Sequence, residues 1–344
     1  MTERPTVFVV FGGQSAEHDV SCVTAKHVLA AINTDRYTIV PIGITRSGQW
    51  SKASVDLDAE SLDPAGDPVD PFALFSTTPN AVVLPLLHGP FGEDGTIQGL
   101  CEMAGVAYAG AGVLGSALAM DKIAAKNALD AAGVPQARWL GMNADEISTS
   151  TASDVIDQLG SPVFVKPANM GSSVGVSRAE TIDEVNAALT LAASYDEWIV
   201  IEEAVNGREI EISVLGNRHP RTSLPGEIVA GADFYTYEDK YHDGVAELLI
   251  PAPLEDSEIA AMQDMAVQAY RALRVEGLAR ADFFYEPDGR GWLVNELNTM
   301  PGFTPISMYP KMWQASGLEY AELIDELIEL AVERHARRKR NTNR

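Results

Sequence analysis

Residues 277–307, GLARADFFYEPDGRGWLVNELNTMPGFTPIS, constrain the fold of this chain more than any other stretch. They read as two short strands, at 278–285 and 292–298, that are joined by a Pro-Asp-Gly turn at 287–289. A rigid Met-Pro-Gly loop follows the second strand at 300–302. The sequence therefore predicts an antiparallel hairpin that leads directly into a fixed loop.

The register of this hairpin decides which side chains share a face of the sheet. If Arg280 lies opposite Asn298, then Asp282 lies opposite Glu296, and the alternation of side chains places all four on one face. Opposed carboxylates repel each other and destabilise a sheet unless a cation lies between them. Two acids and an amide oxygen form a hard, oxygen-only ligand set, which suits Mg²⁺ with phosphate oxygens completing its octahedron. The alternative is a solvated hairpin face that carries one Arg–Asp ion pair.

The composition narrows the classes of protein to which the chain can belong. At 344 residues it has the length of two or three domains, and its hydrophobic fraction of 46% and charged fraction of 22% are ordinary for a globular protein. The balance of 25 Lys and Arg against 49 Asp and Glu argues against a nucleic-acid or anionic-membrane surface. An anionic small substrate is still compatible, because it needs only a few local cations.

The cysteines and the apolar runs exclude further classes. Cys22 and Cys101, the only cysteines, both lie in helix-like runs, so neither a disulfide framework nor a metal site is indicated. The chain has no apolar run of membrane-spanning length and no basic-then-apolar segment at its start. We therefore expect a cytoplasmic protein.

The N-terminal part has the pattern of a doubly wound parallel sheet. A buried-strand run at 6–11 ends in Gly12-Gly13 and is followed by a helical pattern. Glu17 comes just after this turn, at the carboxyl end of a strand, where open α/β sheets bind ligands. A charge that meets the dipole at a helix start is an equally simple interpretation of Glu17. A second buried strand at 81–87 ends in a glycine-rich loop that contains His88, to which we assign no role as a base.

Changes in composition divide the rest of the chain. Residues 51–80 are rich in Asp, Pro and Ser, with little periodicity, and we interpret them as a surface insertion. A Gly/Ala-rich segment precedes an Ala-rich helix that opens at Asp121, which indicates a boundary near residue 120. The polar and aromatic segment 231–244 has no period, and a stretch of this kind in a compact domain is usually a functional lid. The basic residues 337–340 are interpreted as a solvated tail.

Two lysines and a glycine loop suggest a clamp for a nucleotide. Lys122 lies at the start of the Ala-rich helix, and Lys166 ends a strand at 162–166. The small-residue loop at 171–176, GSSVGV, follows that strand, and its backbone amides could cradle a phosphate. Each lysine also has a simpler interpretation, since Lys is the commonest surface cation.

Seven motifs in order resemble those of the D-alanine–D-alanine ligases of the ATP-grasp superfamily. They are FGGQSAEHDVS, LHGPFGEDG, VKPANMGSSVGV, EEAVNGRE, DKYHDG, ARADFF and NELNTMPGFTPIS. The resemblance implies an α/β, three-domain ATP-grasp architecture with an N-terminal doubly wound parallel sheet. We expect an N-terminal α/β substrate domain at 1–120, a central ATP-grasp subdomain at 121–216 and a C-terminal ATP-grasp and catalytic domain at 217–344. ATP would lie between the sheets of the second and third domains.

The resemblance also implies a reaction and its alternatives. It implies ATP-dependent ligation of two D-alanines through an acyl phosphate, with release of ADP and phosphate, for peptidoglycan precursor synthesis. ATP would be the co-substrate, with two Mg²⁺ ions, replaceable by Mn²⁺, and the protein a homodimer. A D-alanine–D-lactate ligase, or another ATP-grasp carboxylate–amine ligase, would keep the nucleotide residues and change Glu17, Tyr241 or the Ser307 loop. A non-catalytic binding protein would have lost a metal ligand or Arg280, and all are present.

Nucleotide and metal contacts are implied by the resemblance position by position. The phosphate contacts are lysines and loop serines, namely Lys122, Lys166, Lys240, Ser172 and Ser173. The contacts to adenine and ribose lie in one linker and the strand after it, namely Glu202, Glu203, Val205 and Glu209. The metal ligands are Asp282, Glu296 and Asn298, which agrees with the hairpin register above.

Substrate contacts are implied in the same way. Glu17 resembles the acceptor for the first substrate's ammonium, and Ser172 and Tyr241 resemble the groups that form a hydrogen-bonded set with it. Arg280 and the backbone amide of Gly302 match donors that face the developing oxyanion. The other residues at the substrate-binding positions are His88, Ser307 and Met308, the last two where the second substrate's carboxylate is held. Leu is common in the family at the Met308 position.

Overall fold

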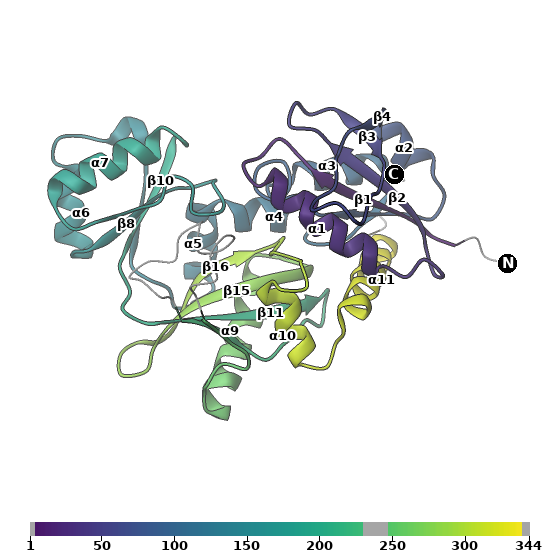
Figure 1. The fold of residues 1–344 in the computed structure, drawn as a ribbon. Coiled ribbons are helices and arrows are strands. Elements are labelled where there is room, and N and C mark those ends of the chain that lie inside the picture. Colours follow the sequence, from purple (N-terminus) through teal and green to yellow (C-terminus); the bar gives the residue numbers. More distant parts are fainter. Residues whose placement is uncertain (1–3, 230–246, 339–344) are drawn as a thin grey trace, which may run out of the picture.

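Three β-sheets form the framework of the chain, and the computed structural model describes them within residues 4–229 and 247–338 (Figure 1). The first sheet has the strand order β4-β3-β2-β1-β5-β6. Its parallel strands are β1 (Thr6–Gly12), β2 (Thr38–Ile44), β5 (Ala81–Pro85) and β6 (Ala107–Tyr108). Its antiparallel edge is made by β3 (Trp50–Ala53) and β4 (Gly66–Pro68).

Helices cover both faces of the first sheet. Along β1, Val7 and Val9 pack with α1 (His18–Ala31) and α11 (Tyr320–Arg337), which share one face. Phe8 and Val10 point the other way, toward α2 (Pro71–Thr77) and α3 (Thr96–Ala104). The alternation follows from the two-residue period of a strand that is buried on both sides. The predicted N-terminal doubly wound sheet is therefore confirmed.

Residues 51–80 are more ordered than the predicted surface insertion. They supply most of β3 and all of β4 and α2, so that interpretation is wrong in part. Phe75 is fully buried against Phe8, with ring centroids 5.2 Å apart, and Asp70 caps α2 by accepting from two backbone amides. The strands are too short for a period to appear in the sequence, which is why the pattern was not informative here.

The second sheet is antiparallel and lies within the central part of the chain. Its order is β7 (Trp139–Asn143), β10 (Trp198–Glu203), β8 (Val163–Pro167) and β9 (Ser177–Ala179). The helices α6 (Thr151–Leu159) and α7 (Ile182–Ala193) pack on it. In the sequence, this sheet is preceded by α4 (Val113–Met120) and α5 (Lys122–Ala131). The carboxylate of Asp121 caps α5.

The third sheet contains the hairpin. Its strands are β14 (Glu247–Leu249), β13 (Gly226–Val229), β11 (Arg208–Gly216), β15 (Gly277–Glu286) and β16 (Gly291–Asn298), with β12 (Arg221–Thr222) beside β11. The helices α9 (Asp256–Ala272) and α10 (Met308–Ala315) pack against it. Arg280 lies opposite Asn298 and Asp282 opposite Glu296, so the predicted register is confirmed. A β-bulge just beyond Asp282 shifts the rest of the pairing by one residue.

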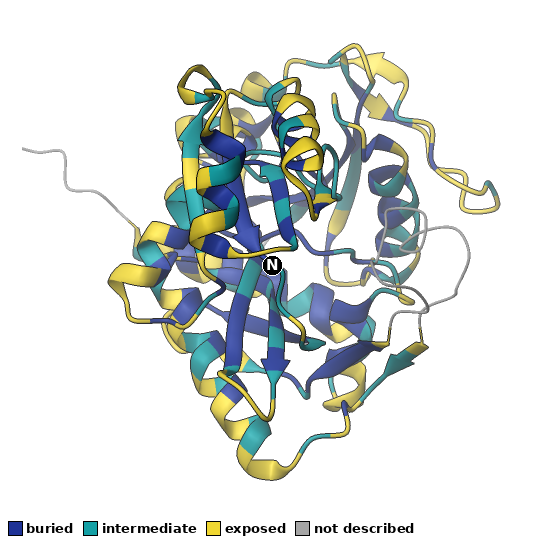
Figure 2. Cartoon of the chain, turned by 90° about the vertical axis from the view of Figure 1, so that its left-hand side faces the viewer, coloured by how far each residue is buried: buried dark blue, intermediate teal, exposed yellow. Residues whose placement is uncertain are grey.

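The three sheets do not follow the predicted domain ranges at two places. β11 lies within 121–216 but pairs with β15 of the third sheet, and α11 lies within 217–344 but packs on the first sheet. The division into three domains stays a prediction. Figure 2 shows the buried strands inside a shell of partly exposed helices. Within residues 4–229 and 247–338, no helix combines the length and apolar character that crossing a membrane requires.

The basic end of α11 is not the solvated tail that the sequence suggested, as far as the structure describes it. The guanidinium of Arg337 pairs with Glu276, and that of Arg338 donates to the same carboxylate at 3.0 Å. One turn earlier, Arg334 is buried and donates to the carbonyls of Tyr108 and Gly110. Arg334 thus fastens the last helix to the first sheet, and Arg337 and Arg338 fasten it to the residue that precedes β15 of the third sheet.

Candidate active site

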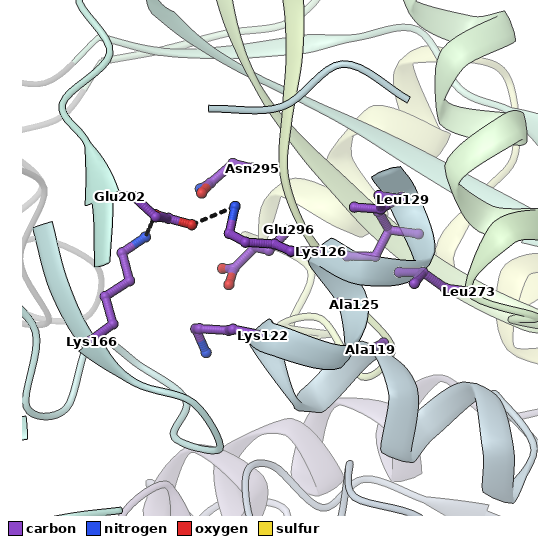
Figure 3. A pocket seen from close by; sticks show the side chains of 11 residues that line it. Ala119, Lys122, Ala125, Lys126, Leu129, Lys166, Glu202, Leu273, Asn295 and Glu296 are labelled. Carbon is purple, nitrogen blue, oxygen red and sulfur yellow. Dashed lines mark hydrogen bonds and ion pairs between the residues drawn. The ribbon is translucent and has the colours of Figure 1, made fainter. Parts of the chain in front are cut away.

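A small pocket lies between the second and third sheets, beside α5 (Figure 3). Its walls carry charged side chains from four elements: lysines of α5 and β8, Glu202 of β10 and Glu296 of β16. The remaining lining residues are Asn295, Ala119, Ala125, Leu129, Leu273 and Leu297. Two predicted nucleotide lysines and one predicted metal ligand therefore face the same space.

One side of the pocket, which we call the cationic half, consists of Lys122, Lys126, Lys166 and Glu202. Glu202 lies between two ammonium groups, with its Oε2 2.5 Å from Lys166 Nζ and its Oε1 2.6 Å from Lys126 Nζ. Burial alone would raise the pKa of Glu202, but the two lysines hold it well below its ordinary value. Burial alone would lower the pKa of Lys166, and Glu202 raises it instead.

Lys126 was not among the predicted site residues. It follows Lys122 by one turn of α5, so both side chains project from the same side of the helix. That spacing was the only signal in the sequence. Its side chain is 3% exposed.

Lys122 reaches the glycine loop that the sequence singled out. Its Nζ donates to the carbonyl of Met170 at 2.7 Å, just before that loop. Burial lowers the pKa of Lys122 and the nearby Lys166 adds to the shift, while Glu296 opposes it. Within the loop, Ser172 and Ser173 have φ angles of 48° and 59°, which non-glycine residues rarely adopt. Such conformations cluster at ligand-binding loops.

A second charged cluster, which we call the acidic half of the site, lies on the hairpin face beside the pocket. It consists of Glu211, Arg280, Asp282 and Glu296, of which Glu296 also lines the pocket. Arg280 binds both carboxylate oxygens of Asp282 at 2.7 Å and approaches Glu211 at 3.0 Å. Burial would lower the pKa of Arg280, but Asp282 and Glu211 raise it well above its ordinary value. Glu211 was not predicted, although it lies directly opposite Asp282 on β11 and alternates with Glu209.

The carboxylate and amide oxygens on this hairpin face are suitable ligands for a hard cation. Asp282 and Glu296 oppose each other, and Asn298 donates through Nδ2 to Asp282 at 2.9 Å. The face does carry an Arg–Asp pair, but Asp282 and Arg280 are only 13% and 18% exposed, so it is not the solvated face of the alternative. Among the described residues, no group of three or more His, Cys, Asp and Glu is arranged to hold a metal ion. Oxygens of a bound ligand would therefore have to complete the coordination.

Glu17 and Ser172, which are far apart in the sequence, meet at a second corner of the site. Ser172 Oγ donates to Glu17 Oε1. Two glycines leave room for this carboxylate, because a Cβ added at Gly89 or Gly171 would lie only 2.8 or 3.0 Å from Glu17 Oε2. Glu17 precedes α1 but makes no capping hydrogen bond with its side chain. Glu17 is nevertheless the N-cap residue of α1, so the helix-start interpretation stays an alternative.

His88 and Glu93 flank the same corner. Burial lowers the pKa of His88, so its neutral ring donates from Nδ1 to the carbonyl of Met300 at 3.0 Å. Glu93, which was not predicted, accepts from the amide of Gly89 at 2.8 Å. Burial, and then the charge of Glu17, raise the pKa of Glu93 to about 8. Its place in the LHGPFGEDG motif was the available signal.

The loop after the hairpin presents backbone groups. Gly302 lies close to Ser307, since a Cβ on it would be 3.1 Å from Ser307 Oγ. The hydroxyl of Ser307 lies 2.8 Å from that of Thr304. Met308 begins α10, and its side chain packs with Ile228 and Met312. Its side chain is thus occupied in packing, and a contact with a ligand would come from its backbone amide at the helix start.

The predicted adenine and ribose positions lie at the end of β10 and along β11. The carboxylate of Glu203 is engaged by Arg138 at 2.7 Å and by Arg290. Glu202 is engaged by lysines, so both side chains already have charged partners. Val205 follows in the loop, and Glu209 is on β11. Lys240 and Tyr241, like the whole predicted lid at 231–244, lie outside the described residues.

Two family models match the chain. The model described as D-ala D-ala ligase N-terminus matches residues 6–111, and that described as D-ala D-ala ligase C-terminus matches residues 128–329. A D-alanine–D-alanine ligase of Arthrobacter sp. (strain FB24) is 47% identical, covering 96% of this chain and 95% of the relative. One of Bacillus velezensis is 46% identical, covering 95% and 98%.

Solved structures agree with the fold. The D-alanine–D-alanine ligase of Coxiella burnetii superposes with a TM-score of 0.82 at 33% identity, covering 98% of this chain and 96% of that one. The VanG D-Ala:D-Ser ligase of Enterococcus faecalis also reaches 0.82, at 32% identity and covering 96% and 100%. The structural neighbours share the ATP-grasp fold, and the chain belongs to the D-alanine–D-alanine ligase family.

Proposed function

We propose that this protein joins two D-alanines to D-alanyl-D-alanine at the expense of ATP, as a step in making the peptidoglycan precursor. The observation that carries the proposal is a pair of neighbouring clusters with opposite charge: three lysines around Glu202 in the pocket, and three acids around Arg280 beside it. A magnesium–triphosphate complex has the matching pair of charges. The Glu17–Ser172 pair supports a nearby site for an ammonium group.

ATP activates a carboxylate that would not otherwise acylate an amine, because oxide is too poor a leaving group. Lys122 and Lys166 hold the α- and β-phosphates, and the ammonium of the first D-alanine binds Glu17. Its carboxylate oxygen attacks the γ-phosphorus in line, the bond to the β-phosphate oxygen breaks, and ADP leaves an acyl phosphate behind. Ser173 supports the phosphates through the strained loop. Adenine and ribose bind at Glu202, Glu203, Val205 and Glu209, in part through backbone groups.

Peptide-bond formation follows at the acyl carbon. The amine of the second D-alanine attacks this carbon, and the negative charge that develops on the carbonyl oxygen is stabilised by Arg280 and the Gly302 amide. Phosphate then leaves as the amide forms. Ser307 and the Met308 amide hold the second carboxylate, and His88 lies beside the first substrate. Arg280 is fixed for this role by its bidentate bond to Asp282.

Asp282, Glu296 and Asn298 would hold two Mg²⁺ ions, or Mn²⁺ in their place, whose chemistry is to neutralise the phosphate charge. The fit rests on the opposed carboxylates and the amide of the hairpin face. Lys240 and Tyr241 have roles implied only by the resemblance, as a phosphate contact and as a partner of Ser172 and Glu17. Both roles stay predictions.

The identity of the second substrate needs its own test, because a D-Ala:D-Ser ligase is among the structures similar to this chain. Release of phosphate from ATP should be measured with D-alanine, L-alanine, D-serine and D-lactate, each alone and each paired with D-alanine. We expect turnover with D-alanine alone and D-alanyl-D-alanine as the product. Turnover that requires D-serine or D-lactate as well would assign the protein to the alternative activity. No ATP turnover with any of them would contradict the proposal.

We also propose that the protein is a cytoplasmic homodimer. Met103 of α3 is 80% exposed and Leu114 of α4 is 54% exposed, and exposed apolar side chains on neighbouring helices suit a contact between copies. Sedimentation of the wild type and of a Met103→Glu/Leu114→Glu variant tests this. A dimer that the variant converts to a monomer is expected, and a monomeric wild type would contradict it.

A further inference from the structure

The buried Glu202 has two partners that differ in their freedom to leave it. Lys126 binds Oε1 and Lys166 binds Oε2, so neither lysine competes with the other for an oxygen (Figure 3). The side chain of Lys126 is 3% exposed, whereas that of Lys166 is 15% exposed. Lys166 is thus the partner on the more open side. It can turn toward a ligand without disturbing the bond between Lys126 and Glu202.

The elements that carry these residues support the same distinction. Lys126 projects from the middle of α5, and Leu129 of the same helix and Leu273 line the pocket beside it. Its backbone carbonyl accepts from Gln136 Nε2 at 2.9 Å, which ties this turn of α5 to the following loop. Lys166 is the penultimate residue of β8, which pairs with β10 and precedes the loop that contains Ser172 and Ser173. Lys166 thus belongs to the strand that leads into this loop, whereas Lys126 belongs to a helix.

A buried carboxylate must keep a counter-ion, because an unpaired charge in an apolar setting is strongly unfavourable. If Lys166 were the only partner of Glu202, its move to a phosphate would leave Glu202 uncompensated. Phosphate would then have to compete with Glu202 for a single ammonium group. With Lys126 in place, Glu202 remains paired when Lys166 departs.

We propose that Lys126 is a positioning residue: it stays paired with Glu202 and so releases Lys166 to bind the nucleotide phosphates. This inference rests on the proposed function, which places the phosphates at Lys166. Lys126 itself touches no phosphate. Its effect on ATP passes entirely through Glu202.

The test measures the dissociation constants of ATP and adenosine, by calorimetry, for the wild type and for K126M. Methionine keeps the length and apolar stem of lysine without its charge. Lys166 should then stay on Glu202, so K126M should bind ATP about tenfold or more weakly. Adenosine, which has no phosphate, should bind within about twofold of the wild type, and the KM for D-alanine should change as little. K126R keeps the charge and should recover most of the loss.

The double variant K126M/E202Q separates this role from the two simpler ones. Removing the charge of Glu202 frees Lys166, so ATP affinity should rise again above that of K126M. If Lys126 contacted phosphate directly, the second substitution would bring no recovery. If Lys126 were only a packing residue, K126M would weaken adenosine and ATP equally. Either of these results would overturn the proposal.

The variant K166M distinguishes a failure of the inference about Lys126 from a failure of the proposed phosphate site. K166M should weaken ATP more than K126M does, because it removes the phosphate contact itself. If K166M binds ATP normally, the placement of the phosphates is wrong and the inference falls with it. If K166M is impaired but K126M is not, only the inference about Lys126 is wrong.

Discussion

The cationic half and the acidic half of the site have opposite arrangements of charge. In the cationic half one carboxylate, Glu202, is shared by lysines, and a further lysine stands nearby. In the acidic half one guanidinium, that of Arg280, is shared by Glu211 and Asp282, and Glu296 stands opposite Asp282. Each half thus holds an internal ion pair and an excess of one sign of charge.

This difference in the sign of the excess charge indicates which kind of ligand the site binds. Excess charge in a partly buried site is unfavourable until a ligand of the opposite sign arrives. A triphosphate satisfies only the cationic half and adds negative charge beside the acidic half. A divalent cation has the reverse effect. The two together satisfy both halves, so the comparison predicts that metal and nucleotide bind cooperatively.

The largest effect is expected from the acidic half. Glu296→Gln removes one acid without changing its shape, and turnover should fall on the order of 10³-fold because the metal is held less well. Phosphate release should be followed across a Mg²⁺ titration, with circular dichroism to show that the fold survives. Asp288→Asn, in the exposed turn of the hairpin, is the matched control. A normal Mg²⁺ requirement and normal turnover in Glu296→Gln would contradict the claim that the acidic half binds the metal.

A smaller loss, on the order of 10²–10³ in kcat, is expected for Arg280→Lys. Lysine keeps the positive charge but cannot form the bidentate bond to Asp282, so the donor facing the oxyanion is misplaced. The KM for ATP should change little, as should the Mg²⁺ requirement. Arg221→Lys, a surface ion pair with Glu326, serves as the control. An unchanged kcat with a raised KM for ATP would place Arg280 in the nucleotide site instead.

For the cationic half, Lys122→Met should raise the KM for ATP roughly 10- to 30-fold, through the loss of one charged contact. The exposed Lys52→Met should have no effect. Combined with Glu296→Gln, the loss of ATP affinity should be smaller than the product of the single losses, because both residues act on one metal–nucleotide complex. Independent, multiplying losses would show that the halves do not share a ligand.

The smallest effect concerns stability at the corner of the site where Glu17 meets Ser172, which Glu93 flanks. The pKa of Glu93 is about 8 in the folded chain, against an ordinary value of 4.5, so the folded state keeps a proton that the unfolded state loses between these pH values. This group therefore lowers stability as pH rises through that window. Glu93→Gln should gain roughly 1–3 kcal/mol in unfolding free energy, relative to wild type, between pH 5 and pH 9. Urea unfolding at both pH values measures it.

The control for this experiment is Glu60→Gln, on an exposed segment between β3 and β4. Its stability relative to wild type should be the same at both pH values. A constant difference for Glu93→Gln as well would mean that Glu93 ionises in the folded chain as it does in the unfolded one.

The acidic half was largely predictable because most of its residues are close together in the sequence. Asp282 and Glu296 belong to one hairpin, and strand alternation with a short turn is enough to set them opposite each other. The bulge that follows was not predictable, since it depends on how β16 packs beyond its partner strand. Glu211 joins through a third strand, whose pairing with β15 no local pattern specifies.

The cationic half was predictable only in part. Lys122 and Lys166 were found from their motifs. The contact of Lys126 with Glu202, in contrast, joins α5 to β10, which are far apart in the sequence. Such a contact depends on tertiary packing. Nothing in the sequence of an Ala-rich helix distinguishes a buried lysine from an exposed one. The same reason explains the basic end of α11, where Arg337 and Arg338 look solvated in sequence but bind Glu276 in the fold.

The central claim is that the two halves bring the γ-phosphate of ATP to the carboxylate of the first substrate. D-alanine labelled with ¹⁸O in its carboxylate tests this directly, with mass spectrometry of the phosphate that is released. Attack by that carboxylate carries one of its oxygens onto phosphorus, and the later attack of the amine on carbon leaves it there. The account predicts one ¹⁸O in each phosphate formed with the dipeptide. Phosphate without label would contradict it.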